Sequence, residues 1–373
     1  MNILKARSTH SGRLERWIGR EGVEHLSASM RGWYGPPIAV ADVPGAVWVC
    51  GDGDFRGPIA AGQFMNVVDF AVMRLKRIWK NAARRQLYRA NTGFSGLSDL
   101  ISEAAAGKKQ DLWYAKNGTA GVLNANSTLW YVGATPAAGA AAAAAPGGTV
   151  PTSATTGALF FNNPTSPDTT HFVRADALSN IAGTLLLYDR LFSVTKAMNS
   201  TATEAVTGVP TRYQNTVAGS QDSVEGNFLI IECRTVLPAT AHNWTVCLYT
   251  NHAGTASQTL PSVTGNASNI VNRLDGPLGT WWCPLATGDR GIKVLTQMQC
   301  SALVATGAID FTIGHPIAAI SIPINLLNCV TDGINTAFNL TRIFDNACLA
   351  FLEILRPSAT LNQYQGSVTV VSG

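Results

Sequence analysis

The C-terminal part of the chain, from Gly291 to Pro357, places the strongest constraint on the fold. Apolar segments of strand length alternate there with short turn-forming sequences. These are Thr306-Gly307, Gly314-His315-Pro316, Asp332-Gly333 and Asp345-Asn346. Apolar runs bounded by Gly, Pro, Asn and Asp are typical of strands in an antiparallel sheet. We therefore predict that this region forms the core of a β-sandwich.

Short β segments are predicted from Ala158 to the end of the chain, with Thr, Ser, Asn and Gly between them. Short strands separated by such polar and glycine-containing segments are typical of a sandwich with long loops. The segment from Leu349 to Leu355 is apolar on both faces apart from Glu353, which predicts a central strand. Residues 185–192 fit either a strand or a short helix. The predicted fold class is mainly β, with a β-sandwich or jelly-roll-like C-terminal domain and a smaller α+β N-terminal anchoring region.

A long helix is predicted at about 63–89, because apolar residues recur there at three- and four-residue spacing without Gly or Pro. Its second half is rich in cations, and the predicted docking residues are Arg74, Arg77, Lys80, Arg84, Arg85 and Arg89. Cations near a helix C-terminus are favoured by the helix dipole, so part of this pattern is structural. The helix faces either solvent or an acidic partner, or it contacts DNA phosphates.

Three regions are predicted along the 373 residues, since one hydrophobic core rarely extends over so long a chain. Residues 1–120 form a basic anchoring region. Residues 121–157 contain the end of a hairpin that turns at Asn117-Gly118, followed by an Ala/Gly/Pro-rich linker over 134–157. Residues 158–373 form the β-sandwich.

The charge content is low: Asp, Glu, Lys and Arg make up 13% of the chain, against roughly 25% in typical domains. Either much of the surface is covered by other subunits, or the exposed surface is neutral and rich in Ser, Thr, Asn and Gly. The charge is also uneven, with 17 Lys and Arg against 10 Asp and Glu through Ala120. A basic N-terminal third indicates contact with a polyanion or with an acidic protein surface.

The seven cysteines are widely spaced and form no CxxC pair, so we predict buried free thiols in a reducing compartment. The N-terminal residues lack the apolar core of a secretory signal, and no run of about 18 apolar residues predicts a membrane span. We therefore expect assembly in a cytoplasm and no membrane contact.

No catalytic or cofactor motif is recognisable, and the six histidines lack metal-ligand spacing. We predict no enzymatic activity, no cofactor and no metal site. Glycan hydrolysis by paired acids is the weaker alternative, with Glu204, Asp222, Glu225 and Glu232 as the candidates. Trp281 and Trp282 either stack on a ligand such as a sugar ring or are ordinary core or interface aromatics.

The basic helix, the Ala/Gly/Pro/Thr linker, the Thr/Ser/Asn-rich β region and the low charge together resemble a virion protein of a tailed bacteriophage. The resemblance is carried best by GDRGIKVLTQMQCSAL, IDFTIGHPIA and VTDGINTAFNLTRIFDNACLAFLEIL in the region 288–357. This region is similar to uncharacterised structural proteins of the phage head or head–tail region. The chain departs from the major capsid protein of the common tailed-phage shell, because it has no long spine helix in mid-chain.

The resemblance implies a non-enzymatic subunit, present in many copies in a virion assembled in the host cytoplasm. Its N-terminal region would dock on the particle, and its β-sandwich would oligomerise or project. The implied partners are copies of itself and other virion proteins, with DNA contact through the basic helix as a further possibility. The alternative is a fibre-like protein that binds a receptor or a carbohydrate.

Overall fold

The structure is a computed structural model that describes residues 93–118, 121–276, 279–334, 340–355 and 358–373. It also gives the backbone of four short strands nearer the N-terminus. The chain divides into two compact units, Met1–Arg85 and Gln86–Gly373. We call the second unit the β body. The predicted helix at about 63–89 lies outside the described residues.

The first unit contains two antiparallel strand pairs. The pairs are β1 (Ile3–Ser8) with β2 (Leu14–Gly19), and β3 (Val47–Trp48) with β4 (Pro58–Ile59).

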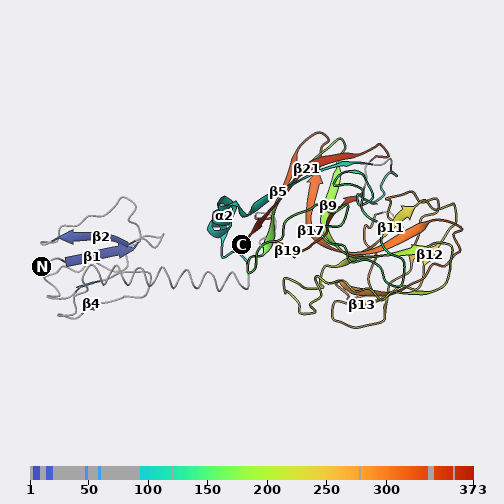
Figure 1. Cartoon of the computed structure of the whole chain (residues 1–373), viewed down its shortest axis with the longest axis horizontal. Helices are drawn as coiled ribbons and strands as arrows, with labels where there is room; N and C mark the ends of the chain where they lie inside the picture. The colour runs from blue at the N-terminus through green and yellow to red at the C-terminus, as the bar shows by residue number, and fades with distance from the viewer. Residues whose placement is uncertain are drawn as a thin grey trace. The chain divides into compact units, whose positions relative to one another are not determined.

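The described part of the β body is mainly β, which confirms the predicted fold class (Figure 1). Its helical elements are α2 (Leu97–Glu103) and the π-helical turn η2 (Ala104–Lys108). Its strands are β5 (Lys109–Asn117), β6 (Ser127–Thr128), β7 (Ala134–Thr135), β8 (Thr170–Ser179), β9 (Gly183–Ala197), β10 (Glu204–Ala205), β11 (Phe228–Thr235), β12 (Asn243–Trp244), β13 (Leu248–Asn251), β14 (Gln258–Thr259), β15 (Val263–Thr264), β16 (Ile292–Met298), β17 (Ala308–Ile322), β18 (Cys329–Asp332), β19 (Arg342–Ile343), β20 (Leu349–Ile354) and β21 (Gln363–Ser372).

A five-stranded sheet of order β11-β17-β9-β20-β6 lies at the centre of the β body. Its two longest strands, β9 and β17, have 15 residues each and pair along their whole length (Figure 1). The ambiguous segment 185–192 is therefore strand. The predicted central strand is also confirmed, because β20 lies between β9 and β6.

One face of the central sheet packs against two further sheets. Near β11 it shares a core with the four-stranded sheet β10-β16-β13-β14, and this core includes Ile231, Leu295 and Phe311. Toward β20 it shares a second core with the six-stranded sheet β18-β8-β21-β5-β7, and this core includes Phe351 and Val368. Burying each such side chain contributes about 1.5–3 kcal/mol to the stability of the sandwich.

The opposite face of the central sheet is covered by the chain between β6 and β8. Backbone hydrogen bonds join Thr149 to Ser193 and Leu159 to Leu349. Trp130 is buried in the third core cluster, which this segment forms with the sheet. The predicted linker over 134–157 therefore lies against the β body of its own chain, and the body begins upstream of Ala158.

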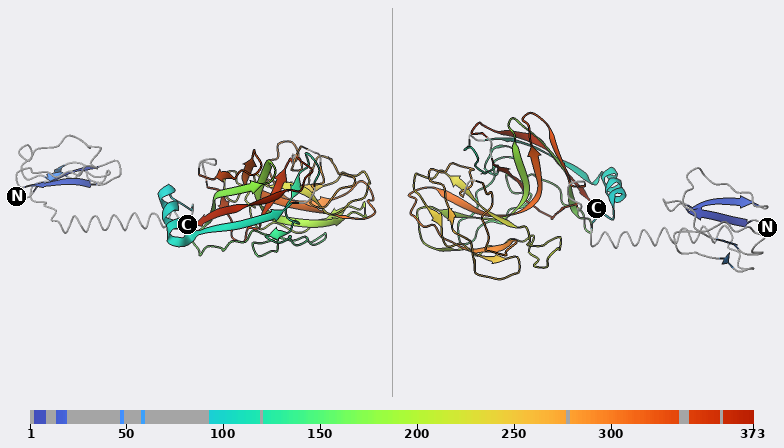
Figure 2. Two further views of the ribbon diagram at one scale, coloured as in Figure 1. Left: turned by 90° about the horizontal axis from the view of Figure 1, so that it is seen from above. Right: turned by 180° about the vertical axis from the view of Figure 1, so that it is seen from behind.

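The hairpin predicted at Asn117-Gly118 is wrong. β5 pairs with β21 over nine residue pairs and with β7 over two, whereas β6 pairs with β20. The return strand of β5 is thus β7, after a longer connection. The ten residues of β21 can form a much longer ladder with β5 than the two residues of β6 could. The pairing with β21 therefore prevails over the local turn signal. Figure 2 shows β5 and β21 side by side.

The break predicted at Gly314-His315-Pro316 is also wrong, because β17 continues through it with bulges at Ile313/Gly314 and Pro316/Ala318. Gly314 is required there, since an added Cβ would lie 2.7 Å from both Phe228 and Tyr188. Pro316 is tolerated because β11 pairs with β17 only as far as Gly314. Beyond that residue β17 is an edge strand, where a missing N–H costs no ladder hydrogen bond.

Candidate functional site

The predicted docking residues Arg74, Arg77, Lys80, Arg84, Arg85 and Arg89 lie outside the described residues. Trp281 and Trp282 are described, and their ring centroids are 5.0 Å apart at an interplanar angle of 73°. Trp281 also packs edge-on against Phe228 and is partly buried against the third core cluster. Trp282 is 44% exposed. The two rings therefore do not form one flat stacking surface, and only Trp282 presents much of its ring to solvent.

Each of the four acids considered for hydrolysis has its own partner. Glu204 pairs with Lys196 at 2.5 Å, Glu225 pairs with Arg290 at 2.5 Å, and the Asp222 carboxylate accepts a hydrogen bond from Asn215. Glu232 forms a fully buried ion pair with Arg190 at 2.5 Å. Three of these contacts are ion pairs, and the fourth is a hydrogen bond from an amide.

Glu232 and Asp310 face each other across β11 and β17 on the covered side of the central sheet. Both carboxylates are fully buried, and each accepts a hydroxyl hydrogen bond of 2.5 Å, from Thr312 and Thr195 respectively. Burial opposes the charge of Arg190, but the nearby Glu232 carboxylate raises the pKa of Arg190 well above the ordinary value. The network ties the covering segment to the sheet, because Tyr131 also donates to Asp310.

A second buried cluster surrounds Asp275. Its carboxylate accepts hydrogen bonds from His242 Nε2 at 2.9 Å and from Trp244 Nε1 at 2.7 Å. The other oxygen accepts from the Asn266 backbone N–H at 2.7 Å and from Asn269 Nδ2 at 3.0 Å. The cluster joins the loop 264–276 to β12. All four contacts go to protein groups, so the carboxylate has little capacity left for a ligand.

In the described part of the chain, no group of three or more His, Cys, Asp or Glu side chains is placed to hold a metal ion. Six cysteines are described, and all six are buried and free, as predicted for them. None of the described helices combines the length and the apolar composition needed to span a bilayer.

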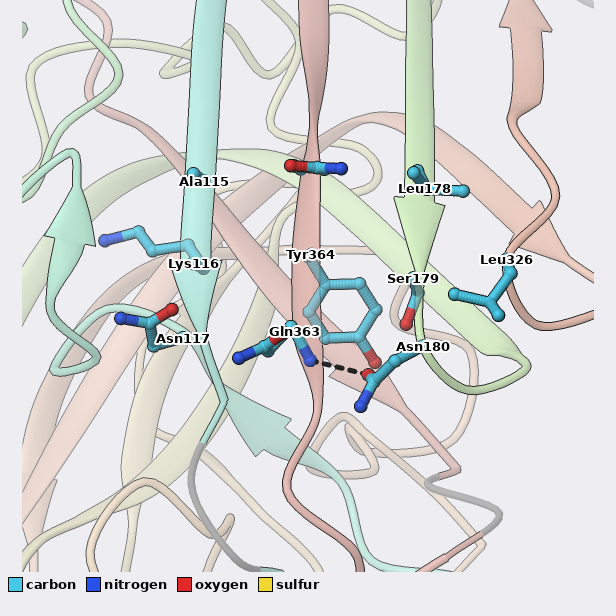
Figure 3. A pocket seen from close by; sticks show the side chains of 10 residues that line it. Ala115, Lys116, Asn117, Leu178, Ser179, Asn180, Leu326, Gln363 and Tyr364 are labelled. Atoms are coloured by element: carbon cyan, nitrogen blue, oxygen red, sulfur yellow. Dashed lines mark hydrogen bonds between the residues drawn. The ribbon is translucent and has the colours of Figure 1, made fainter.

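An open cluster of ligand-capable side chains lies on the outer face of the six-stranded sheet. Burial alternates along β5, so that Leu112 and Tyr114 face the core while Trp113 points outward and is 71% exposed. At the end of β5, the strands β5, β21 and β8 border a shallow hollow (Figure 3). Its outward-facing lining consists of Ala115, Asn117, Leu178, Asn180, Gln363 and Gln365, with Leu326 at one side.

The base of the hollow is held rigidly by buried polar contacts. Tyr364 donates a hydrogen bond of 2.8 Å to the buried Glu353 carboxylate. Lys116 is buried, and its ammonium group donates to the carbonyl oxygens of Val132 and Pro136 at 3.0 and 2.7 Å. Burial lowers the Lys116 pKa to about 8. In Figure 3 this ammonium group points away from Tyr364, so the lysine supports the strand end.

Sequence analysis did not select Trp113 as a site residue, although the signal was present. In the run KQDLWYAKN, Leu112 and Tyr114 share one phase of the alternation, and Trp113 falls with Asp111, Ala115 and Asn117 on the other. An aromatic residue among the polar positions of an alternating strand points away from the core. The partner residues on β21 and β8 are more than 60 positions away and were not predictable from this run.

No family model matches this sequence, and no curated protein matches it significantly. One solved structure is similar at a low level, described as "Structure of infectious bursal disease virus Gt strain". The two chains are 8% identical, with 70% of this chain and 80% of the other covered and a TM-score of 0.14. A likeness this low carries no argument about fold or function.

Proposed function

We propose that this protein is a non-enzymatic structural subunit of a particle of the tailed-phage virion kind, present in many copies. Its N-terminal region docks it on the particle, and its β body contacts further copies of itself. The mainly β architecture and the low charge support this proposal, as does the resemblance of region 288–357 to phage structural proteins.

One observation carries the proposal. The connection from β17 to β18 and the start of β18 expose four large apolar side chains within seven residues. These are Ile324 (58% exposed), Leu326 (73%), Leu327 (49%) and Val330 (51%). Exposed apolar residues are ordinary singly, but a group without any charge marks an interaction surface. We call these four residues the apolar segment.

A second copy of the chain is the occupant that fits this segment. The sequence from Pro323 to Val330 contains no charged residue, and interface centres are likewise depleted of Lys, Glu and Asp. A stable interface buries about 800 Å² on each partner, which requires more surface than the apolar segment alone. Other parts of the β body surface would supply the remainder.

The test is the self-association of the full chain, measured by sedimentation velocity over a range of concentrations. Wild type is expected to form oligomers, and the double variant Ile324→Asp/Leu327→Asp is expected to shift toward monomer. Val236→Asp is the matched control, because Val236 is 55% exposed elsewhere on the β body. A strictly monomeric wild type, or equal effects of the two variants, would contradict the proposal.

Docking of the N-terminal region has its own test. Joint replacement of Arg77, Lys80, Arg84 and Arg85 by Gln is expected to block incorporation into particles while the β body still folds. If the predicted helix contacts DNA, the wild-type chain also binds duplex with an affinity that falls steeply with salt. Normal incorporation of the variant would reject docking through these cations.

The second candidate function is binding of a receptor or carbohydrate. The observation that favours it is the exposed Trp113 beside a hollow lined by side-chain amides.

A further inference from the structure

The outer residues of β5 and β21 form rows across the six-stranded sheet. Strand register places Trp113 beside Ser367, Ala115 beside Gln365, and Asn117 beside Gln363. On the other side of β21, Gln365 lies beside Leu178 of β8. We call the surface formed by Trp113, Ala115, Asn117, Gln363, Gln365, Leu178 and Asn180 the Trp113 face.

The indole of Trp113 is open to a planar ligand. Asp111, two residues the other way along β5, pairs with Lys109, and the two remaining same-face neighbours are small: Ser367 directly opposite on β21 and Ala115 two residues along β5. Neither side chain is large enough to cover the ring, in agreement with its 71% exposure. An exposed indole offers an apolar face that suits the C–H faces of a flat ring.

The side-chain amides beside this ring are free to bind a ligand. Within the described residues, the side chains of Asn117, Gln363 and Gln365 form no hydrogen bond with the protein. Each amide carries both a carbonyl acceptor and an NH₂ donor. Asn180 is fixed instead. Its Oδ1 accepts the Gln363 backbone N–H at 2.8 Å (Figure 3), and its Nδ2 donates to the Leu361 carbonyl oxygen at 2.9 Å.

The Trp113 face itself carries no charged side chain. The nearest outer charges on the same strands form ion pairs, Lys109 with Asp111 at 2.8 Å and Arg174 with Asp176 at 4.0 Å. This neutral surface does not provide the basic groups that phosphate or nucleic acid would require. It instead provides ring stacking together with mixed donors and acceptors, which match a polyhydroxylated ring with apolar C–H faces.

We propose that the Trp113 face binds an extended neutral oligosaccharide. One sugar ring stacks on Trp113, and the following rings lie along β5 over the hollow, where their hydroxyl groups meet the amides of Gln365, Gln363 and Asn117. Trp113 and Asn117 are four residues apart on one strand, a distance of roughly 13 Å. The face therefore accommodates more than one ring. This inference does not depend on self-association through the apolar segment.

The test is isothermal titration of the full chain with three neutral probes: cellohexaose, maltohexaose and N-acetylchitohexaose. We expect saturable binding of at least one probe at millimolar concentration or below. Trp113→Ala is expected to weaken it by about tenfold or more, since loss of contact with an aromatic face is worth at least this factor. Gln365→Ala is expected to weaken it less, and Trp113→Phe to retain part of it.

Trp282→Ala is the matched control, because Trp282 is the other strongly exposed tryptophan of the described chain and lies outside the Trp113 face. It should leave binding unchanged. The proposal is overturned if no probe binds at millimolar concentration, or if Trp113→Ala binds as well as wild type. Loss of binding in Trp282→Ala with normal binding in Trp113→Ala would likewise overturn it and move the site to the Trp281–Trp282 pair.

Discussion

Replacement of Asp275 by Asn tests the assignment of the buried cluster around this residue. The carboxylate is fully buried and faces four donors, two on each oxygen. An amide has only one oxygen, so in either orientation its NH₂ group meets two donors. Two buried hydrogen bonds are lost, and the negative charge opposite His242 disappears.

The protonation of His242 follows from its two contacts. Nε2 faces the Asp275 carboxylate at 2.9 Å, and Nδ1 faces the Thr240 carbonyl oxygen at 3.1 Å. Both partners are acceptors, so these contacts favour the imidazolium form, in which both ring nitrogens carry a proton. Burial opposes this charge, but the hydrogen bond with Asp275 raises the His242 pKa above the ordinary 6.5.

The expected loss in free energy of unfolding is about 3–5 kcal/mol. Two hydrogen bonds to a charged group contribute about 1.5–3 kcal/mol each, and breaking a buried ion pair costs a similar total. The loss depends on pH. The raised His242 pKa stabilises the fold fully below about 6.5, and this contribution disappears as pH rises through the folded-state pKa. The difference between wild type and Asp275→Asn is therefore largest at acidic pH.

The assay is urea unfolding of both proteins across this pH range, with hydrogen exchange of the Trp244 indole N–H as a local probe. Exchange should accelerate in the variant, because the Trp244 N–H then faces either an NH₂ group or an uncharged amide oxygen in place of the carboxylate. Asp345→Asn serves as the control, because Asp345 is exposed. A loss below about 1 kcal/mol, or a loss independent of pH, would refute an imidazolium–carboxylate pair here.

Two further substitutions test the central sheet. Arg190→Met leaves the fully buried Glu232 without its cation and is expected to lower the free energy of unfolding in urea by about 3–5 kcal/mol. The double variant Arg190→Met/Glu232→Gln should recover part of that loss. A double variant no more stable than Arg190→Met would contradict the pairing. Phe351→Asp places an unpaired carboxylate in the core and is expected to abolish soluble folded protein, as judged by circular dichroism and gel filtration. Phe160→Asp is its control, since Phe160 is 57% exposed, and a folded Phe351→Asp variant would show that β20 is not a core strand.

Local sequence alone determined the mainly β class and the position of the core strand β20. These follow from strand-length apolar runs and from Gly, Pro, Asn and Asp between them, and such signals act over a few residues. Alternation in β5 also determined that Trp113 faces away from Leu112 and Tyr114, since successive side chains of a strand point to opposite faces.

Only the tertiary structure decided which strands pair and what each face meets. β5 pairs over nine residue pairs with the distant β21 and over only two with β7, and the segment over 134–157 covers its own sheet. The break expected at Gly314 is absent, because β17 stays paired with β9 on both sides of the bulges there. Pairing and burial depend on contacts between residues far apart in the chain, and those contacts outweigh local turn preferences. For the same reason, the amides beside Trp113 and the donors around Asp275 appear as sites only once the strands are assembled.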